Sequence, residues 1–118
     1  MGRVEGKVAL ITGAARGQGR SHAVRLAEEG ADIVALDIAA PIGTVGYPAA
    51  TPEDLEETVK LVEAHDRRVI GRIVDVRDLA ALGALVADAY AELGHIDIVS
   101  ANAGIFELGS LADTSEAE

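Results

Sequence analysis

Three glycines near the amino terminus have a spacing that suits phosphate binding. Gly13, Gly17 and Gly19 follow Thr12 and a short apolar run, and a segment with helical spacing comes after them. In a strand–turn–helix unit of this kind, glycines let backbone N–H groups approach a phosphate, and the helix dipole favours the anion. The order differs from Gly-x-Gly-x-x-Gly, and no Gly-Lys-Ser/Thr of a Walker loop follows. We expect this turn to hold a pyrophosphate; the alternative is an ordinary turn rich in small residues.

An aspartate ends the second apolar run. Asp37 comes roughly 20 residues after the glycine turn, where a dinucleotide-binding fold places an acid on the adenosine ribose. A carboxylate there accepts hydrogen bonds from the ribose hydroxyls and repels a 2′-phosphate. It therefore favours NAD over NADP, unless Asp37 is only a solvated turn residue.

Alternating apolar runs and amphipathic segments must position these residues. We expect strands at 7–12, 32–37, 68–74 and 96–100, and helices at 18–29, 52–65 and 79–93. Thr51 and Asp78 are expected to cap the second and third helices, and Gly94 to end the third. The pattern predicts an α/β fold, a doubly wound parallel sheet with strand order 3-2-1-4 and a ligand site beyond the strand carboxyl ends. The buried side of the third helix is expected to carry Leu79, Leu82, Leu85, Val86, Ala89, Tyr90 and Leu93.

The composition argues against several kinds of partner. The formal net charge is −10 and cysteine is absent, so we expect neither nucleic acid, an anionic membrane surface nor a thiolate metal site. His22, His65 and His95 lack metal-ligand spacing and are predicted to be surface or helix-end residues. No apolar run approaches the ~20 residues of a membrane span. A cytoplasmic location is the expectation.

Four motifs in this order resemble those of the short-chain dehydrogenase/reductase family. They are Thr12-Gly13-x-x-x-Gly17-x-Gly19, Asp37, Asp75-Val76-x-Asp78 and Asn102-Ala103-Gly104. The longer segment 39–55 resembles the carveol-dehydrogenase-like, mycofactocin-coupled branch, which implies tightly held NAD. The resemblance implies a Rossmann-like domain over residues 1–118, incomplete and ending before the later strands.

The resemblance also implies which residues bind the cofactor. Asp75 and the backbone of Val76 would meet the adenine, while Asn102 would shape the adenosine side of the cleft. Arg16 is of a kind that often accompanies NADP in the family, and it therefore conflicts with Asp37. The full set of expected cofactor-binding residues is Gly13, Arg16, Gly17, Gln18, Gly19, Asp37, Asp75, Val76, Asn102, Ala103 and Gly104.

The family's catalytic Tyr-x-x-x-Lys pair does not occur in these residues. Thr51 stands four positions after Tyr47, and Gly94 four after Tyr90. We expect the front part of a longer NAD-dependent oxidoreductase for a secondary alcohol or carbonyl substrate, a homodimer or homotetramer when complete. The Ser-x-x-Glu capping box at Ser115 supports that expectation. A non-catalytic dinucleotide-binding module is the alternative. A phospho-acceptor receiver domain is disfavoured because Gly13–Arg16 occupies the place of its acidic pair.

Overall fold

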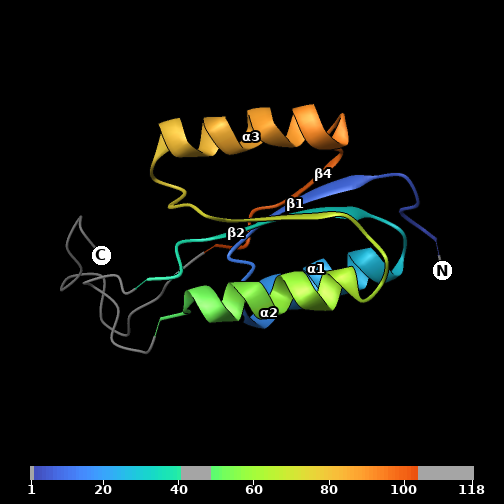
Figure 1. The fold of residues 1–118 in the computed structure, drawn as a ribbon, viewed down its shortest axis with the longest axis horizontal. Helices are drawn as coiled ribbons and strands as arrows, with labels where there is room; N and C mark the ends of the chain where they lie inside the picture. The colour runs from blue at the N-terminus through green and yellow to red at the C-terminus, as the bar shows by residue number, and fades with distance from the viewer. Residues whose placement is uncertain (1, 41–48, 104–118) are drawn as a thin grey trace, which may run out of the picture.

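The computed structural model describes residues 2–40 and 49–103, so Gly104, Ser115 and residues 41–48 of the long 39–55 segment lie outside the described residues. The elements, in chain order, are β1 Val8–Thr12, α1 Gly17–Glu28, β2 Asp32–Asp37, α2 Pro52–Glu63, β3 Val69–Ile73, α3 Leu79–Leu93 and β4 Ile98–Ser100. The strands form one parallel sheet in the order β3-β2-β1-β4, which confirms the predicted topology. Figure 1 shows α1 and α2 on one face of this sheet and α3 on the other.

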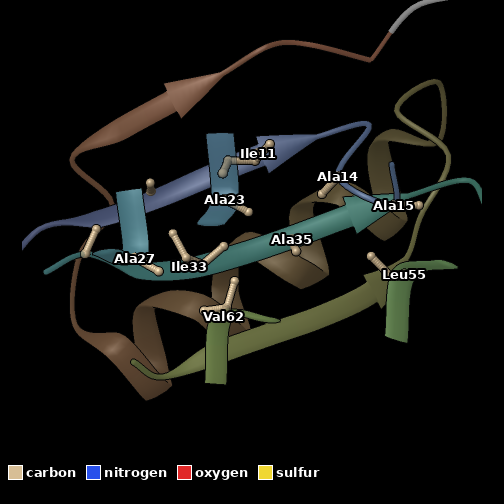
Figure 2. Packing of buried hydrophobic residues seen from close by; sticks show 11 residues of the cluster. Ile11, Ala14, Ala15, Ala23, Ala27, Ile33, Ala35, Leu55 and Val62 are labelled. Atoms are coloured by element: carbon tan, nitrogen blue, oxygen red, sulfur yellow. The ribbon is translucent and has the colours of Figure 1, made fainter. Parts of the chain in front are cut away.

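The two central strands are buried along their whole length, as continuous apolar runs in a parallel sheet should be. Alternate side chains of β1 and β2 enter two separate cores. Ile11 and Ile33 face α1 and α2 (Figure 2), where Ala23 and Ala27 let α1 lie close to the strands. The opposite face, including Leu10, packs against Leu85, Ala89 and Leu93 of α3.

The predicted caps at Thr51, Asp78 and Gly94 are confirmed, while α1 and α2 end one and two residues earlier than expected. Thr51 and Asp54 form a reciprocal capping box at the start of α2, with Pro52 in its first turn. The Asp78 side chain accepts a hydrogen bond from the backbone N–H of Ala81, and Gly94 ends α3 in the left-handed conformation at φ +89°. These local signals explain why the observed bounds lie close to the expected ones.

Two residues expected on the buried side of α3 are exposed instead: Leu79 is 80% exposed and Tyr90 51%. Tyr90 is one step beyond the buried Ala89, and successive residues turn by about 100° around the helix axis. Leu79 is the first residue of α3, more than one turn before Leu85, the first buried residue of the helix. Apolar residues occur all around α3, so the sequence overestimated how many of them are buried; only Leu85, Ala89 and Leu93 are fully buried.

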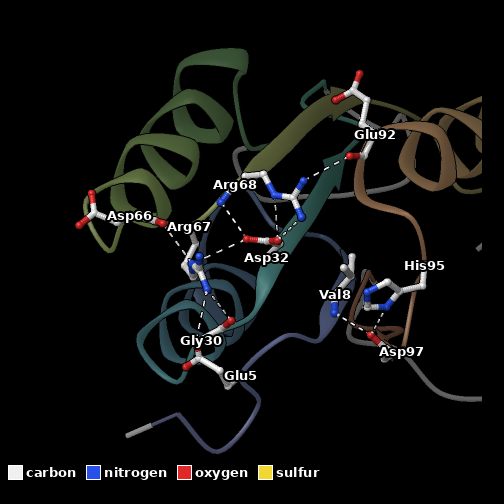
Figure 3. Close-up of polar contacts among 10 residues, drawn as sticks. All are labelled: Glu5, Val8, Gly30, Asp32, Asp66, Arg67, Arg68, Glu92, His95 and Asp97. Atoms are coloured by element: carbon white, nitrogen blue, oxygen red, sulfur yellow. Dashed lines mark hydrogen bonds and ion pairs between the residues drawn. The ribbon is translucent and has the colours of Figure 1, made fainter.

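Ion pairs and hydrogen bonds hold the amino-terminal ends of the strands together (Figure 3). The buried Asp32 carboxylate accepts three hydrogen bonds from Arg68, from its backbone N–H and its guanidinium. The Asp97 carboxylate accepts from the backbone N–H of Val8 at 2.9 Å and so joins the β4 end to β1. This end of the sheet is occupied by structural contacts, which leaves the carboxyl ends for a ligand. No helix in the described part of the chain is long and apolar enough to cross a membrane.

Candidate functional site

The glycine turn lies at the carboxyl end of β1, and the geometry at each of its three glycines explains why glycine is found there. Gly13 and Gly17 have φ values of +66° and +61°, which favour glycine. A Cβ on Gly19 would stand 2.0 Å from the Gly13 carbonyl oxygen, so α1 could not lie so close to the turn with any other residue there. A Cβ on Gly17 would meet no atom of the described residues within 4 Å. The space in front of Gly17 is therefore open to a ligand.

The first turn of α1 lacks the cap that the other helices have. Its N-cap is Arg16, which makes no side-chain capping hydrogen bond, whereas Thr51 and Asp78 cap α2 and α3. The first backbone N–H groups of a helix have no acceptor within the helix, and together with the dipole they favour an anion. An uncapped helix start beside the open space at Gly17 fits the pyrophosphate of a dinucleotide.

Asp37 fixes the glycine turn as well as carrying charge at this edge. Its carboxylate is buried and accepts from the backbone N–H of Ala15 at 3.0 Å and from that of Ala39 at 2.9 Å. Each carboxylate oxygen has a second lone pair, so the group can still accept from a ribose hydroxyl. The sequence predicted the acceptor role and missed the contact with the turn.

The end of β4 is bonded to the same turn. The Asn102 amide nitrogen lies 3.4 Å from the carbonyl oxygens of both Thr12 and Gly13, and the backbone N–H of Ala103 donates to Thr12 Oγ1 at 2.8 Å. Asn102 thus contacts neighbouring strand backbone, as expected. The structure brings the turn, Asp37 and Asn102 together.

Asp75 and Val76 follow β3, at the same carboxyl edge. The Asp75 carboxylate accepts hydrogen bonds from the backbone and guanidinium of Arg77, and these, the side-chain bonds first, lower the pKa of Asp75 to about 2. Val76 is 41% exposed. The hydrogen bonds between Arg77, two positions away, and the Asp75 carboxylate were not predicted from the sequence.

Three further side chains at this edge were not predicted to matter. Arg20 of α1 and Thr58 of α2 bond to the carbonyl oxygens of the glycine turn. His22, expected at the surface, is half-buried in the body of α1, and its Nδ1 lies 2.9 Å from Ser100 Oγ. The only feature of the sequence that could have identified these three residues is that each is a polar residue on the inner side of α1 or α2.

Comparison with known proteins decides the family. Residues 7–118 match the model for short chain dehydrogenase. The chain belongs to this family. It is 60% identical over 116 residues to an uncharacterised NAD-dependent oxidoreductase of Mycobacterium tuberculosis, covering 98% of this chain and 42% of the relative. It is 57% identical over 105 residues to the (−)-trans-carveol dehydrogenase of Rhodococcus erythropolis, covering 89% of this chain and 38% of that enzyme.

A solved structure agrees with this short-chain dehydrogenase assignment. The carveol dehydrogenase of Mycobacterium avium, in complex with NAD, superposes with a TM-score of 0.94 at 55% identity, covering 98% of this chain and 42% of that one. The chain therefore spans about two fifths of the length of the relatives that it matches. The family resemblance inferred from the four motifs is confirmed, and so is the resemblance to carveol dehydrogenases inferred from the 39–55 segment.

Proposed function

We propose that residues 1–118 form the NAD-binding part of an NAD-dependent oxidoreductase. The observation that carries the proposal is the uncapped start of α1 beside the open space at Gly17, with the Asp37 carboxylate on the next strand. An anion binds at the first feature and a ribose at the second. Two relatives at more than half identity are named as NAD-dependent or as NAD complexes, which supports the same cofactor.

Each predicted residue has a role in holding the cofactor. The turn from Gly13 to Gly19, with Arg16, Gly17 and Gln18 at the helix start, binds the pyrophosphate through backbone N–H groups. Asp37 accepts from the adenosine ribose, Asp75 and Val76 meet the adenine, and Asn102 and Ala103 shape the adenosine side, a role also proposed for Gly104. When bound, NAD accepts or supplies a hydride at its nicotinamide. The residues described here bind and orient it.

The charge at the ribose selects NAD over NADP. Asp37 is held rigidly by two backbone N–H groups, so it cannot turn away from a 2′-phosphate. Arg16 is the N-cap of α1, on the side of α2: the Thr51 backbone hydrogen bond is the main cause that lowers the pKa of Asp54, and the charge of Arg16 makes the smallest contribution. We therefore give Asp37 the greater weight.

The substrate of the complete protein is proposed to be a secondary alcohol or the corresponding carbonyl compound. Two relatives carry the name carveol dehydrogenase, which supports this class. These 118 residues alone have no Tyr-x-x-x-Lys pair and are expected to bind NAD without catalysis.

A homodimer or homotetramer and a cytoplasmic location are predictions for the complete protein. The alternative is a non-catalytic dinucleotide-binding module, which would share every feature described above.

Native mass spectrometry of the protein purified from its source tests the proposal. A subunit with one NAD-sized adduct, and a chain that continues to a Tyr-x-x-x-Lys helix, is the expected result. NAD bound to a chain without that pair would favour the binding module. Absence of NAD, with no binding on titration, would contradict both.

A further inference from the structure

Two side chains hold the glycine turn from the side of the helices. Arg20 lies one turn into α1, and Thr58 lies in the middle of α2, where its side chain is completely buried. Thr58 Oγ1 is 2.8 Å from the carbonyl oxygen of Ala14, and Arg20 Nη2 donates to that of Ala15 at 2.6 Å. Neither residue belongs to the motifs that identify the turn.

The two side chains also bond to each other and to α2. Arg20 Nε donates to Thr58 Oγ1 at 3.0 Å, so Thr58 accepts from Arg20 and can still donate its single hydroxyl hydrogen. The Ala14 carbonyl oxygen at 2.8 Å is nearer to Thr58 Oγ1 than those of Ala15 at 3.2 Å and Asp54 at 3.4 Å. The second Nη2 hydrogen of Arg20 reaches the carbonyl oxygen of Asp54 at 2.7 Å. The planar guanidinium therefore joins three acceptors in fixed directions, which a lysine ammonium cannot reproduce.

With these contacts, every backbone polar group of Ala14 and Ala15 has a partner. Their N–H groups bond to the Leu36 carbonyl and the Asp37 carboxylate, and their carbonyls bond to Thr58 and Arg20. Both peptide planes are thereby fixed immediately before Arg16 and the first turn of α1. The helix start has no side-chain cap of its own, so its orientation depends on this network.

We propose that Arg20 and Thr58 are positioning residues for the dinucleotide, which hold the glycine turn in its binding conformation before the cofactor arrives. The inference rests on the proposed function and extends it to residues that do not line the open space at Gly17. A site whose competent conformation is less populated binds its ligand more weakly in proportion. Loosening the turn should therefore weaken binding of phosphate-containing ligands and spare a ligand without phosphate.

The test uses paired variants of the full protein as its host makes it, after any retained NAD has been removed and native mass spectrometry has confirmed the removal. Thr58→Val removes the hydroxyl at nearly constant shape, and Thr58→Ser keeps the hydroxyl and removes the methyl group. Arg20→Lys keeps the charge and removes the planar fork, while Arg25→Lys makes the same change at the exposed far end of α1. Calorimetric titration with NAD, ADP and adenosine is compared with urea unfolding and far-UV circular dichroism for each variant.

We expect Thr58→Val and Arg20→Lys to weaken NAD and ADP about tenfold, with adenosine changed less than about twofold. Thr58→Ser and Arg25→Lys should bind NAD, ADP and adenosine with the affinities of the wild type. Unchanged NAD affinity in both folded variants would overturn the inference, as would equal losses for ADP and adenosine. Failure of both Thr58→Val and Arg20→Lys to fold would mean a purely structural role. A wild type that binds neither NAD nor ADP would instead reject the proposed function itself.

Discussion

At the scale of single residues, Asp37 performs two tasks with one carboxylate. It binds the backbone of the glycine turn and places a negative charge where a ribose is proposed to lie. Asp37→Asn separates these tasks, because an amide keeps one acceptor oxygen and loses the charge. We expect the wild type to bind NAD about tenfold or more tightly than NADP, and the variant to bring this ratio close to one.

The ratio, rather than either affinity alone, is the measurement for Asp37, since loss of one turn contact should weaken both cofactors. Fluorescence titration with NAD and NADP gives it directly. Asp88→Asn makes the same change on α3, where the carboxylate pairs with Arg72 on the opposite face of the sheet. An equal preference for both cofactors in the wild type would contradict the assignment of Asp37.

Asp75 provides a prediction about pH. The guanidinium of Arg77 lowers the pKa of this carboxyl to about 2, below the ordinary aspartate value of about 3.9. The pair therefore favours the folded chain above the ordinary value, and this contribution is lost as the pH falls towards 2. In Arg77→Gln, carboxyl-carbon NMR should find the Asp75 midpoint shifted up towards the ordinary value. An unshifted midpoint would show that a group other than Arg77 lowers the pKa of Asp75.

At the scale of secondary structure, the sequence predicted most of what local chemistry determines. The strands, the order of the sheet and the caps at Thr51 and Asp78 follow from apolar periodicity and from side chains within three residues of the helix start. Arg20 and Thr58 could not be found in this way, because their partners are distant in sequence and Thr58 approaches the turn only after α2 has packed on the sheet. The exposure of Tyr90 likewise depends on how wide a strip of α3 the sheet covers.

The close approach of α1 to the glycine turn predicts opposite effects for one substitution at two glycines. Gly19→Ala places a Cβ 2.0 Å from the Gly13 carbonyl, so the helix must shift, and we expect the free energy of unfolding to fall by about 2–3 kcal/mol. Gly83→Ala lies in the exposed interior of α3, where a Cβ meets nothing within 4 Å. It should raise the free energy of unfolding by about 0.5–1 kcal/mol. Urea unfolding measures both; a loss at Gly83 or a gain at Gly19 would contradict the packing.

At the scale of the whole molecule, both edge strands of the sheet, β3 and β4, have an open side among the described residues, and the β4 edge is the one at issue for association. There β4 pairs with β1 alone, and Val99, in register with Leu10 on the α3 side, is 64% exposed. An open strand edge beside an apolar side chain favours pairing with another chain. We therefore expect residues 1–118, made alone, to associate as their concentration rises.

Val99→Lys should reduce that association, because a charge on an edge strand opposes pairing between chains. Ala84→Lys adds the same side chain at an exposed position of α3, away from the edge, and serves as the control for the change in net charge. Sedimentation velocity over a range of concentrations should show a fall in the associated fraction for Val99→Lys alone. Equal effects of the two lysines would assign association to overall charge, and a monomeric wild type at every concentration would mean that the β4 edge is already covered in solution.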